Sequence, residues 1–297
     1  MALWQTRHAA ALLAGARPGL GVEEVVVSTV GDRRTDLPIA EIGGKGVFAK
    51  EVQAAVLDGR ADFAVHSGKD LPSATPPGLV IAAVLERGDA RDALVGATLA
   101  ELGPGALVAT GAPRRRAQLA WLRPDLTFAD LRGNVDTRLR RAPEFGALVL
   151  GHAGLQRLGR ADAVAEVLEP SVLVPQVAQG TIAIECRADD AETGELLGLL
   201  EHAPTRVGFR AERAYLDALG GDCTLPAGAH AIVTPSGTDD ADGVDGAFGT
   251  VELTAVLASL DGHVLLRSTG RGEDPEALGR ALAGELLDGS GGRALLL

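Results

Sequence analysis

Residues 62–72 read Asp-Phe-Ala-Val-His-Ser-Gly-Lys-Asp-Leu-Pro. The apolar run predicts a short buried strand that ends near Val65, and the residues after it predict a polar turn. This turn carries Ser67, Lys69 and Asp70. Ligands of open α/β sheets bind outside the carboxyl ends of the strands. The stretch therefore predicts a ligand-binding turn, while an ordinary surface ion pair between Lys69 and Asp70 stays open as the alternative.

Short β-rich runs and helical patterns alternate on both sides of this turn. Strands are expected at 23–30, 62–65, 79–85, 106–109, 146–150 and 181–186, and helices at 2–14, 45–58, 114–122, 135–141 and 192–201. This alternation predicts α/β architecture. After about residue 200 the expected elements are a helix at 206–219, strands at 229–234, 250–257 and 263–267, and a last helix at 275–287. That part predicts a small α+β domain.

The composition excludes several classes of protein. The chain has 297 residues, 46% hydrophobic and 23% charged, which is enough to bury a sizeable core. No apolar run is long enough to span a bilayer. Two cysteines are too few for a disulfide framework, and a net charge of −12 opposes binding to nucleic acid or anionic membranes. We expect a cytoplasmic protein without a metal site that binds neither nucleic acid nor membrane.

Positive charge is concentrated in residues 114–141. This segment has eight arginines and three acids, hence a net charge of +5, which leaves −17 on the rest of the chain. Arg114 and Arg115 begin a predicted helix after a strand, and Arg132 precedes another helix. Arginines at helix N-termini bind carboxylates or phosphates well. We expect a polyanionic ligand here, and the alternative is a solvated surface.

The two cysteines lie in different contexts. Cys186 alternates with Ile182 and Ile184 in a predicted strand, which indicates a buried, inert thiol. Cys223 lies in the loop Gly-Gly-Asp-Cys-Thr-Leu-Pro after a predicted helix, where a thiol can be reached and modified.

Taken together, seven segments resemble the hydroxymethylbilane synthase family, also called porphobilinogen deaminases. They are IGGKGVFAKEV (42–52), ADFAVHSGKDLP (61–72), RRRAQL (114–119), LRGNVDTRL (131–139), AGLQRLG (153–159), PQVAQGTIAIECR (175–187) and ERAYLDALGGDCTLPAGAHA (212–231). They occur in the family's order and extend from the first lobe to the C-terminal domain.

The resemblance implies a transferase of porphyrin and haem biosynthesis. Such an enzyme condenses four molecules of porphobilinogen head to tail, with loss of ammonia at each step, and releases the linear tetrapyrrole hydroxymethylbilane by hydrolysis. It implies two α/β domains like those of periplasmic binding proteins, 1–85 with 177–198 and 86–176, followed by the α+β domain 199–297. We expect a monomer.

The resemblance also assigns roles to individual residues. Asp70 matches the catalytic aspartate, and Cys223 matches the cysteine that carries the dipyrromethane cofactor through a thioether. Lys45 and Phe48 match a lid. The residues implied to bind substrate and cofactor are Ser67, Lys69, Thr110, Arg114, Arg115, Arg132, Gly133, Arg138, Arg157 and Gln179.

The sequence departs from the family pattern at several positions. It opens at Met1, inside the first expected helix, so a first strand with a carboxylate-binding arginine and serine is absent. We expect this chain to be less soluble and less active than one extended upstream. The remaining departures are Gly68 for a methionine, Gly111 and Ala112 for paired serines, and Ala178 for a glycine.

These departures keep two alternatives open. One is a catalytically weak or inactive relative. The other is a two-lobed small-anion binding protein without catalysis, which would have no use for Cys223.

Overall fold

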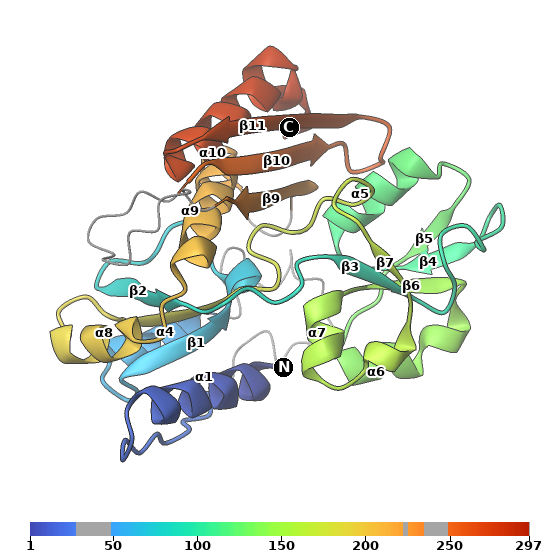
Figure 1. Cartoon of the computed structure of the whole chain (residues 1–297). Helices are drawn as coiled ribbons and strands as arrows, with labels where there is room; N and C mark the ends of the chain where they lie inside the picture. The colour runs from blue at the N-terminus through green and yellow to red at the C-terminus, as the bar shows by residue number, and fades with distance from the viewer. Residues whose placement is uncertain (28–48, 222–224, 235–248, 297) are drawn as a thin grey trace.

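The computed structural model describes residues 1–27, 49–221, 225–234 and 249–296, which form three sheets (Figure 1). The first sheet has the order β1 (Phe63–Ser67), β8 (Ile182–Arg187), β2 (Leu79–Val84). The second has the order β5 (Thr127–Ala129), β4 (Leu107–Ala109), β6 (Ala147–Gly151), β3 (Asp92–Val95), β7 (Val164–Leu168). The third has the order β11 (Leu265–Gly272), β10 (Val251–Ala258), β9 (Ala227–Val233).

In the first sheet, β8 lies between two antiparallel neighbours and is buried on both faces. Ile182, Ile184 and Cys186 share one face because side chains alternate along a strand, and this face packs against Ala9 and Leu13 of α1 (Ala2–Ala16). Two further helices, α4 (Lys50–Leu57) and α8 (Ala191–Gly198), complete this lobe.

The second sheet is mixed. β4 is parallel to β5 and β6, whereas β3 is antiparallel to β6 and β7. Each parallel strand leads into a helix: α5 (Pro113–Leu122), α6 (Val135–Arg140) and α7 (His152–Arg157). Pro113 can be the first residue of α5, because the backbone N–H groups of the first helical turn have no acceptor within the helix and proline therefore loses no hydrogen bond there. The carboxyl ends of parallel strands share one sheet edge, so these three helix N-termini gather there.

The third sheet is an antiparallel meander that packs against α9 (Ala203–Ala218) and α10 (Pro275–Gly284). A turn of π-helix, residues 285–289, follows α10. The hydroxyl of Tyr215 on α9 donates to the carbonyl of Val256 on β10, 2.8 Å away. Among the described residues, none of the helices has the length and apolar character needed to cross a bilayer.

Two crossovers connect the first two sheets. Residues 85–91 lead from β2 to β3, and residues 169–181 return from β7 to β8. A chain that leaves one α/β lobe, builds a second and returns to the first has the two-lobed plan of periplasmic binding proteins. The expected fold class, two such lobes and a small α+β part, is confirmed.

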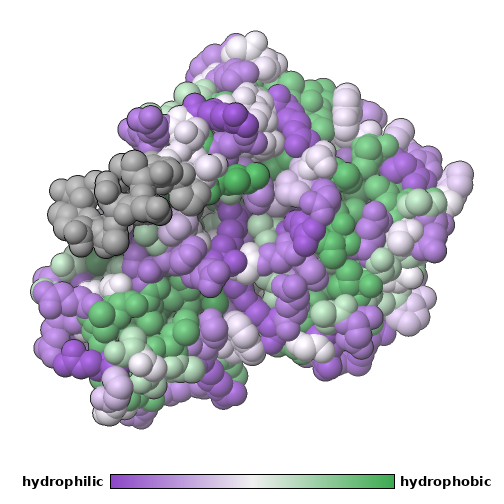
Figure 2. All heavy atoms as spheres, in the orientation of Figure 1, coloured by the Kyte–Doolittle hydropathy of each residue, from purple (hydrophilic) through white to green (hydrophobic). Residues whose placement is uncertain are grey.

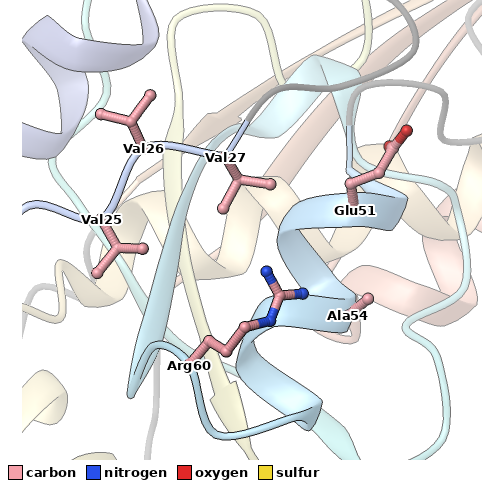
Figure 3. Close-up of a pocket in the computed structure, with 6 residues that line it drawn as sticks. All are labelled: Val25, Val26, Val27, Glu51, Ala54 and Arg60. Carbon is pink, nitrogen blue, oxygen red and sulfur yellow. The ribbon is translucent and has the colours of Figure 1, made fainter.

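Several expected elements differ from the structure. The strand expected at 23–30 is wrong over 23–27, where the described residues form no strand. Val25, Val26 and Val27 instead form one side of a surface hollow opposite Ala54 of α4 and Arg60 (Figure 3). The helix expected at 192–201 ends at residue 198.

Four short elements were not expected from the sequence. They are the strands β3, β5 and β7 and the helix α7, and none is longer than six residues.

A single carboxylate joins both crossovers to the third sheet. Glu212, on α9 and fully buried, accepts from Arg87 through Nη1 and Nη2 at 2.6 and 3.2 Å. It also accepts from the backbone amides of Ala178 and Ala231, at 2.6 and 2.8 Å. Arg87 Nε in turn donates to the carbonyl of Gln179, 2.9 Å away. All the groups that face this carboxylate are donors, so it is fully paired.

We predict that Glu212→Ala lowers the free energy of unfolding by about 3–5 kcal/mol, because a partly buried guanidinium and two buried amides lose their acceptor. Urea unfolding measures this loss. Glu252→Ala, which removes the partner of the exposed Arg271, is the control and is expected to cost less than about 1 kcal/mol. An equal, small loss in both variants would contradict the role of Glu212.

Candidate active site

The turn after β1 is a single 3₁₀ turn, Gly68–Asp70. The amide of Gly68 donates to the carbonyl of Thr181 on the returning crossover, 2.9 Å away, which fixes where the turn begins. Ser67 precedes the turn, and its hydroxyl does not cap it. Lys69 and Asp70 therefore leave the sheet together, at the place where the crossover meets the first lobe.

Asp70 and Lys69 are perturbed in opposite directions. Asp70 is exposed as a residue, yet the protein around its carboxylate desolvates it. This desolvation raises the pKa of Asp70 above its ordinary value, against the opposing charges of Lys69, His66 and Arg138. Desolvation also lowers the pKa of Lys69, which Asp70 raises and the nearby Arg115 lowers further. The turn of the first lobe thus faces arginines of the second.

Those arginines are organised by Asp92, the first residue of β3. Its fully buried carboxylate accepts from Arg114 Nη2 at 2.7 Å, Arg115 Nε at 2.9 Å and Gln179 Nε2 at 2.9 Å. Burial alone would raise the pKa of Asp92, but Arg114 and Arg115 outweigh it and lower the pKa to about 2. Asp92 is therefore ionised at neutral pH.

Arg114 and Arg115 occupy different environments. Arg114 is 1% exposed, and its Nη1 donates to the carbonyl of Val174 at 2.5 Å, so its guanidinium is used within the protein. Arg115 Nη1 donates to Val149 at 3.1 Å, and its Nη2 lies 3.4 Å from Gln179 Oε1. The charge of Arg115 also acts on Lys69. Arg115 thus lies next to the Lys69–Asp70 turn, whereas Arg114 is bound to Asp92 and Val174.

Thr110 lies at the carboxyl end of β4 and is buried. Its hydroxyl accepts from the amide of Ala112, 3.2 Å away. At Gly111 a Cβ would lie 2.9 Å from the carbonyl oxygen of Leu131, which is closer than real Cβ contacts allow. The backbone here therefore favours glycine, and of the expected polar positions in this turn only Thr110 offers a hydroxyl.

Arg132, Gly133 and Arg138 form the second cationic turn, at the beginning of α6. Gly133 has φ +108°, which an L side chain rarely adopts, and its carbonyl accepts from Arg138 Nε at 2.8 Å. Burial lowers the pKa of Arg138 to about 10, helped by the positive charges of Arg115 and Arg132 and opposed by Asp70. Nη1 of Arg132 is buried without a hydrogen-bond partner among the described residues. This turn holds positive charge that the described protein does not neutralise.

Arg157 links the lobes directly. It belongs to α7 of the second lobe, and its Nη2 donates to the carbonyl of Gly180 in the returning crossover at 2.6 Å. Its guanidinium also lies over the ring of Trp4 on α1, 5.6 Å from the ring centroid. Burial lowers the pKa of Arg157. Arg157 is therefore at the junction of the lobes, on the α1 side.

Three expected site residues, Lys45, Phe48 and Cys223, lie outside the described residues. Cys186 is fully buried, as expected, and burial raises the pKa of its thiol, so it is inert at neutral pH. Within the described ranges, no group of three His, Cys, Asp or Glu side chains could hold a metal ion.

Sequence reasoning missed Asp92 and a buried group next to the Lys69–Asp70 turn. His66 Nε2 lies 3.2 Å from Oε2 of Glu185, whose two oxygens also accept from Gln53 Nε2 at 3.3 and 2.9 Å. A lone acid inside an otherwise apolar strand is a signal that could have found Glu185. Nothing local marks Asp92, because its partners lie more than twenty residues away.

The residues present fit a ligand with several carboxylates. The positive charges of Arg115 and Arg138 act against that of Lys69, and those of Arg115 and Arg132 act against that of Arg138. Nη1 of Arg132 has no acceptor in the part of the chain that the structure describes. A carboxylate supplies both negative charge and acceptors. Figure 2 shows hydrophilic residues along the valley between the lobe that carries α1 and the lobe that carries α7, with apolar surface on both sides. Fold and site together define a two-lobed protein whose cationic groups suit a ligand with several carboxylates.

Comparison with known proteins identifies the family. A family model described as porphobilinogen deaminase, dipyrromethane cofactor binding domain, matches residues 1–195, and the porphobilinogen deaminase C-terminal domain matches residues 208–288. The chain belongs to the porphobilinogen deaminase family, which confirms the family, the transferase class and the dipyrromethane cofactor that the sequence predicted.

Curated relatives agree over the whole chain. Porphobilinogen deaminase of Roseiflexus sp. (strain RS-1) is 47% identical over 100% of this chain and 95% of its own length. That of Roseiflexus castenholzii is 46% identical over the same shares of both chains. That of Nitratidesulfovibrio vulgaris is 42% identical over 98% of this chain and 92% of its own length.

Solved structures with a similar chain path include a double mutant of the BvgS VFT2 domain of Bordetella pertussis. It is 16% identical over 70% of this chain and 82% of its own, with a TM-score of 0.39. A TRAP periplasmic solute-binding protein from Roseobacter denitrificans, with bound β-D-glucuronate, is 10% identical over 66% of this chain and 72% of its own, with a TM-score of 0.38. The two-lobed assignment depends on the crossovers and not on these likenesses.

We predict that Asp70→Asn raises the thermal midpoint at neutral pH. The folded pKa of Asp70 lies above its ordinary 3.8, so ionised Asp70 costs stability above the folded pKa and nothing below the unfolded pKa. The difference in midpoint, variant minus parent, is therefore positive at about pH 7.5 and shrinks as the pH falls to about 4. Asp58→Asn, on the exposed surface, is the control. A lower midpoint at neutral pH, or a gain that ignores pH, would refute the perturbation.

Proposed function

We propose that this protein is a hydroxymethylbilane synthase. It condenses four porphobilinogen molecules head to tail, releases ammonia at each coupling, and hydrolyses the linear tetrapyrrole from the enzyme. The observation that carries this proposal is the Lys69–Asp70 turn, which faces the arginines of the second lobe across the cleft in a chain of this family.

Asp70 is the proposed catalytic acid and base. Its raised pKa keeps the protonated form accessible, so it can assist the departure of ammonia from the substrate. As a carboxylate it can stabilise the cation that is left and accept the proton lost after coupling. One group can act in both roles because burial and the charges of Lys69, His66 and Arg138 pull its pKa in opposite directions.

The cationic side chains are proposed to bind carboxylates. Each porphobilinogen brings an acetate and a propionate, so the growing chain needs several cations. The charges of Arg115 and Arg138 act on the Lys69–Asp70 turn and that of Arg132 acts on Arg138, whereas Arg114 holds Asp92. The other members of the proposed binding set are Ser67, Lys69, Thr110, Gly133, Arg157 and Gln179.

Dipyrromethane, bound through a thioether to Cys223, would supply the acceptor pyrrole for the first coupling. Its own carboxylates suit the same arginines, and Cys223 is the proposed attachment site because Cys186 is fully buried. Lys45 and Phe48 are proposed to form a lid. The domain bounds 1–85 with 177–198, 86–176 and 199–297, a monomeric state and a cytoplasmic location belong to the same proposal.

We expect Cys223→Ser protein to lack the cofactor adduct. Intact mass of the purified parent should exceed the sequence mass by two pyrrole units, and incubation with porphobilinogen should release tetrapyrrole. Cys186→Ser is the matched control and should keep both adduct and activity. An adduct on Cys186, or tetrapyrrole formation by protein that carries no adduct, would refute the assignment.

Arg132→Leu and Arg138→Leu should stall elongation, because a substrate carboxylate left unpaired in the cleft costs about 2–5 kcal/mol. Partly elongated enzyme should then accumulate and be visible by mass. Arg140→Leu, on the same helix as Arg138 but exposed, is the control. If both cleft variants complete the cycle like Arg140→Leu, the arginines form a solvated surface instead.

A further inference from the structure

The Lys69–Asp70 turn leaves little room for a side chain at Gly68, its first residue. A Cβ at Gly68 would lie 3.1 Å from the methyl carbon of Ala178 and 3.1 Å from Cε2 of Phe209. Both distances are shorter than nearly all Cβ contacts in proteins, so the neighbours already fill the space in front of Gly68. One neighbour belongs to the returning crossover and the other to α9.

Ala178 is held in an unfavourable backbone conformation. Its φ is +58°, and it is the one non-glycine residue with a positive φ in the described part of the chain. Its amide donates to the buried carboxylate of Glu212, which helps to keep it there. Gly68 and Ala178 are also two of the positions at which the sequence departs from the family pattern. The methyl group of Ala178, on the returning crossover, thus lies opposite Gly68, where the family pattern has a methionine side chain.

One face of α9 contacts the polypeptide on both sides of Asp70. Phe209 is 3% exposed and packs on Gly68, two residues before Asp70. Arg213, one helical turn further on, lies with its guanidinium 5.1 Å from the centroid of the Phe209 ring. Its Nη2 donates to the carbonyl of Ser73, three residues after Asp70, at 2.6 Å. Figure 1 shows α9 running from the third sheet toward the first.

We propose that Phe209 and Arg213 are positioning residues for the reaction: they hold the Lys69–Asp70 turn from both sides and thereby set the place of the Asp70 carboxylate in the cleft. Ala178 completes this support from the crossover. The inference depends on the proposed function of Asp70, but it assigns to α9 a role that the chemistry of the turn does not by itself require.

A positioning role differs measurably from a purely structural one. If the turn shifts, the carboxylate is misplaced relative to the reacting atoms, and kcat falls while the arginines still bind substrate. If Phe209 only fills the core, its removal lowers the thermal midpoint and leaves kcat unchanged at temperatures where the protein is folded.

The first test truncates the ring. Phe209→Ala is expected to lower kcat by roughly 10- to 100-fold and to change KM for porphobilinogen by less than about threefold. Leu282→Ala is the matched control, because Leu282 is 4% exposed, lies on α10 and belongs to the same hydrophobic core as Phe209. It should lower the thermal midpoint comparably and leave kcat unchanged. Equal kcat values in the two variants would overturn the proposal.

The second test exchanges bulk across the contact and keeps the proposal falsifiable if Phe209→Ala folds poorly. Gly68→Met alone should lower kcat, because its side chain would meet Phe209 and Ala178. Gly68→Met combined with Phe209→Val and Ala178→Gly should recover most of the lost kcat, a strong departure from additivity. Additive losses in the triple variant would contradict a shared packing site.

Intact mass separates failure of this inference from failure of the proposed function. Parent protein that carries the adduct and makes tetrapyrrole supports the function, whatever the α9 variants do. Phe209→Ala protein that keeps the adduct but loses kcat supports positioning, and the same protein with parental kcat refutes it. Arg213→Lys, which keeps the charge, should retain more activity than Arg213→Ala if the contact with Ser73 positions the turn.

Discussion

Asp92 must keep all its partners, because a buried carboxylate that loses one of them is left with an uncompensated charge. Its three donors come from α5 and from the returning crossover, so the same pairing that satisfies Asp92 also fixes Arg115 beside the Lys69–Asp70 turn. Glu212, on α9, accepts from Arg87 of one crossover and from Ala178 of the other, and so joins both crossovers to α9. The two buried acids thus hold the crossovers between the lobes in place, and the position of the cationic groups depends on them.

The site that results is electrostatically costly without its ligand. Burial and mutual repulsion lower the pKa values of Lys69 and Arg138, and burial raises that of Asp70. Each shift means that the charged form is less favourable here than in water. A substrate with two carboxylates relieves the repulsion between the cations. For Asp70, desolvation raises the pKa, and a carboxyl group with a raised pKa can donate as well as accept a proton.

Local patterns predicted what depends on local sequence. A strand followed by a polar turn was expected in residues 62–72 and is present, although β1 ends at Ser67, two residues beyond the expected end near Val65. The burial of Cys186 follows from strand alternation. The different roles of Arg114 and Arg115 were not predictable, because they depend on Asp92, more than twenty residues away. The strand expected at 23–30 fails over 23–27 for a related reason, since β propensity describes a residue's fitness for a sheet and not the presence of a partner strand.

The account depends most on electrostatic contact across the cleft between Asp70 of one lobe and Arg138 of the other. The pKa of Asp70, measured by NMR on protein with labelled aspartate side chains and assigned with Asp70→Asn, tests this contact directly. We expect a pKa above the ordinary 3.8 in the parent and a higher one in Arg138→Leu, because the positive charge of Arg138 lowers it. A parental pKa at or below the ordinary value, or one that Arg138→Leu leaves unchanged, would contradict the account.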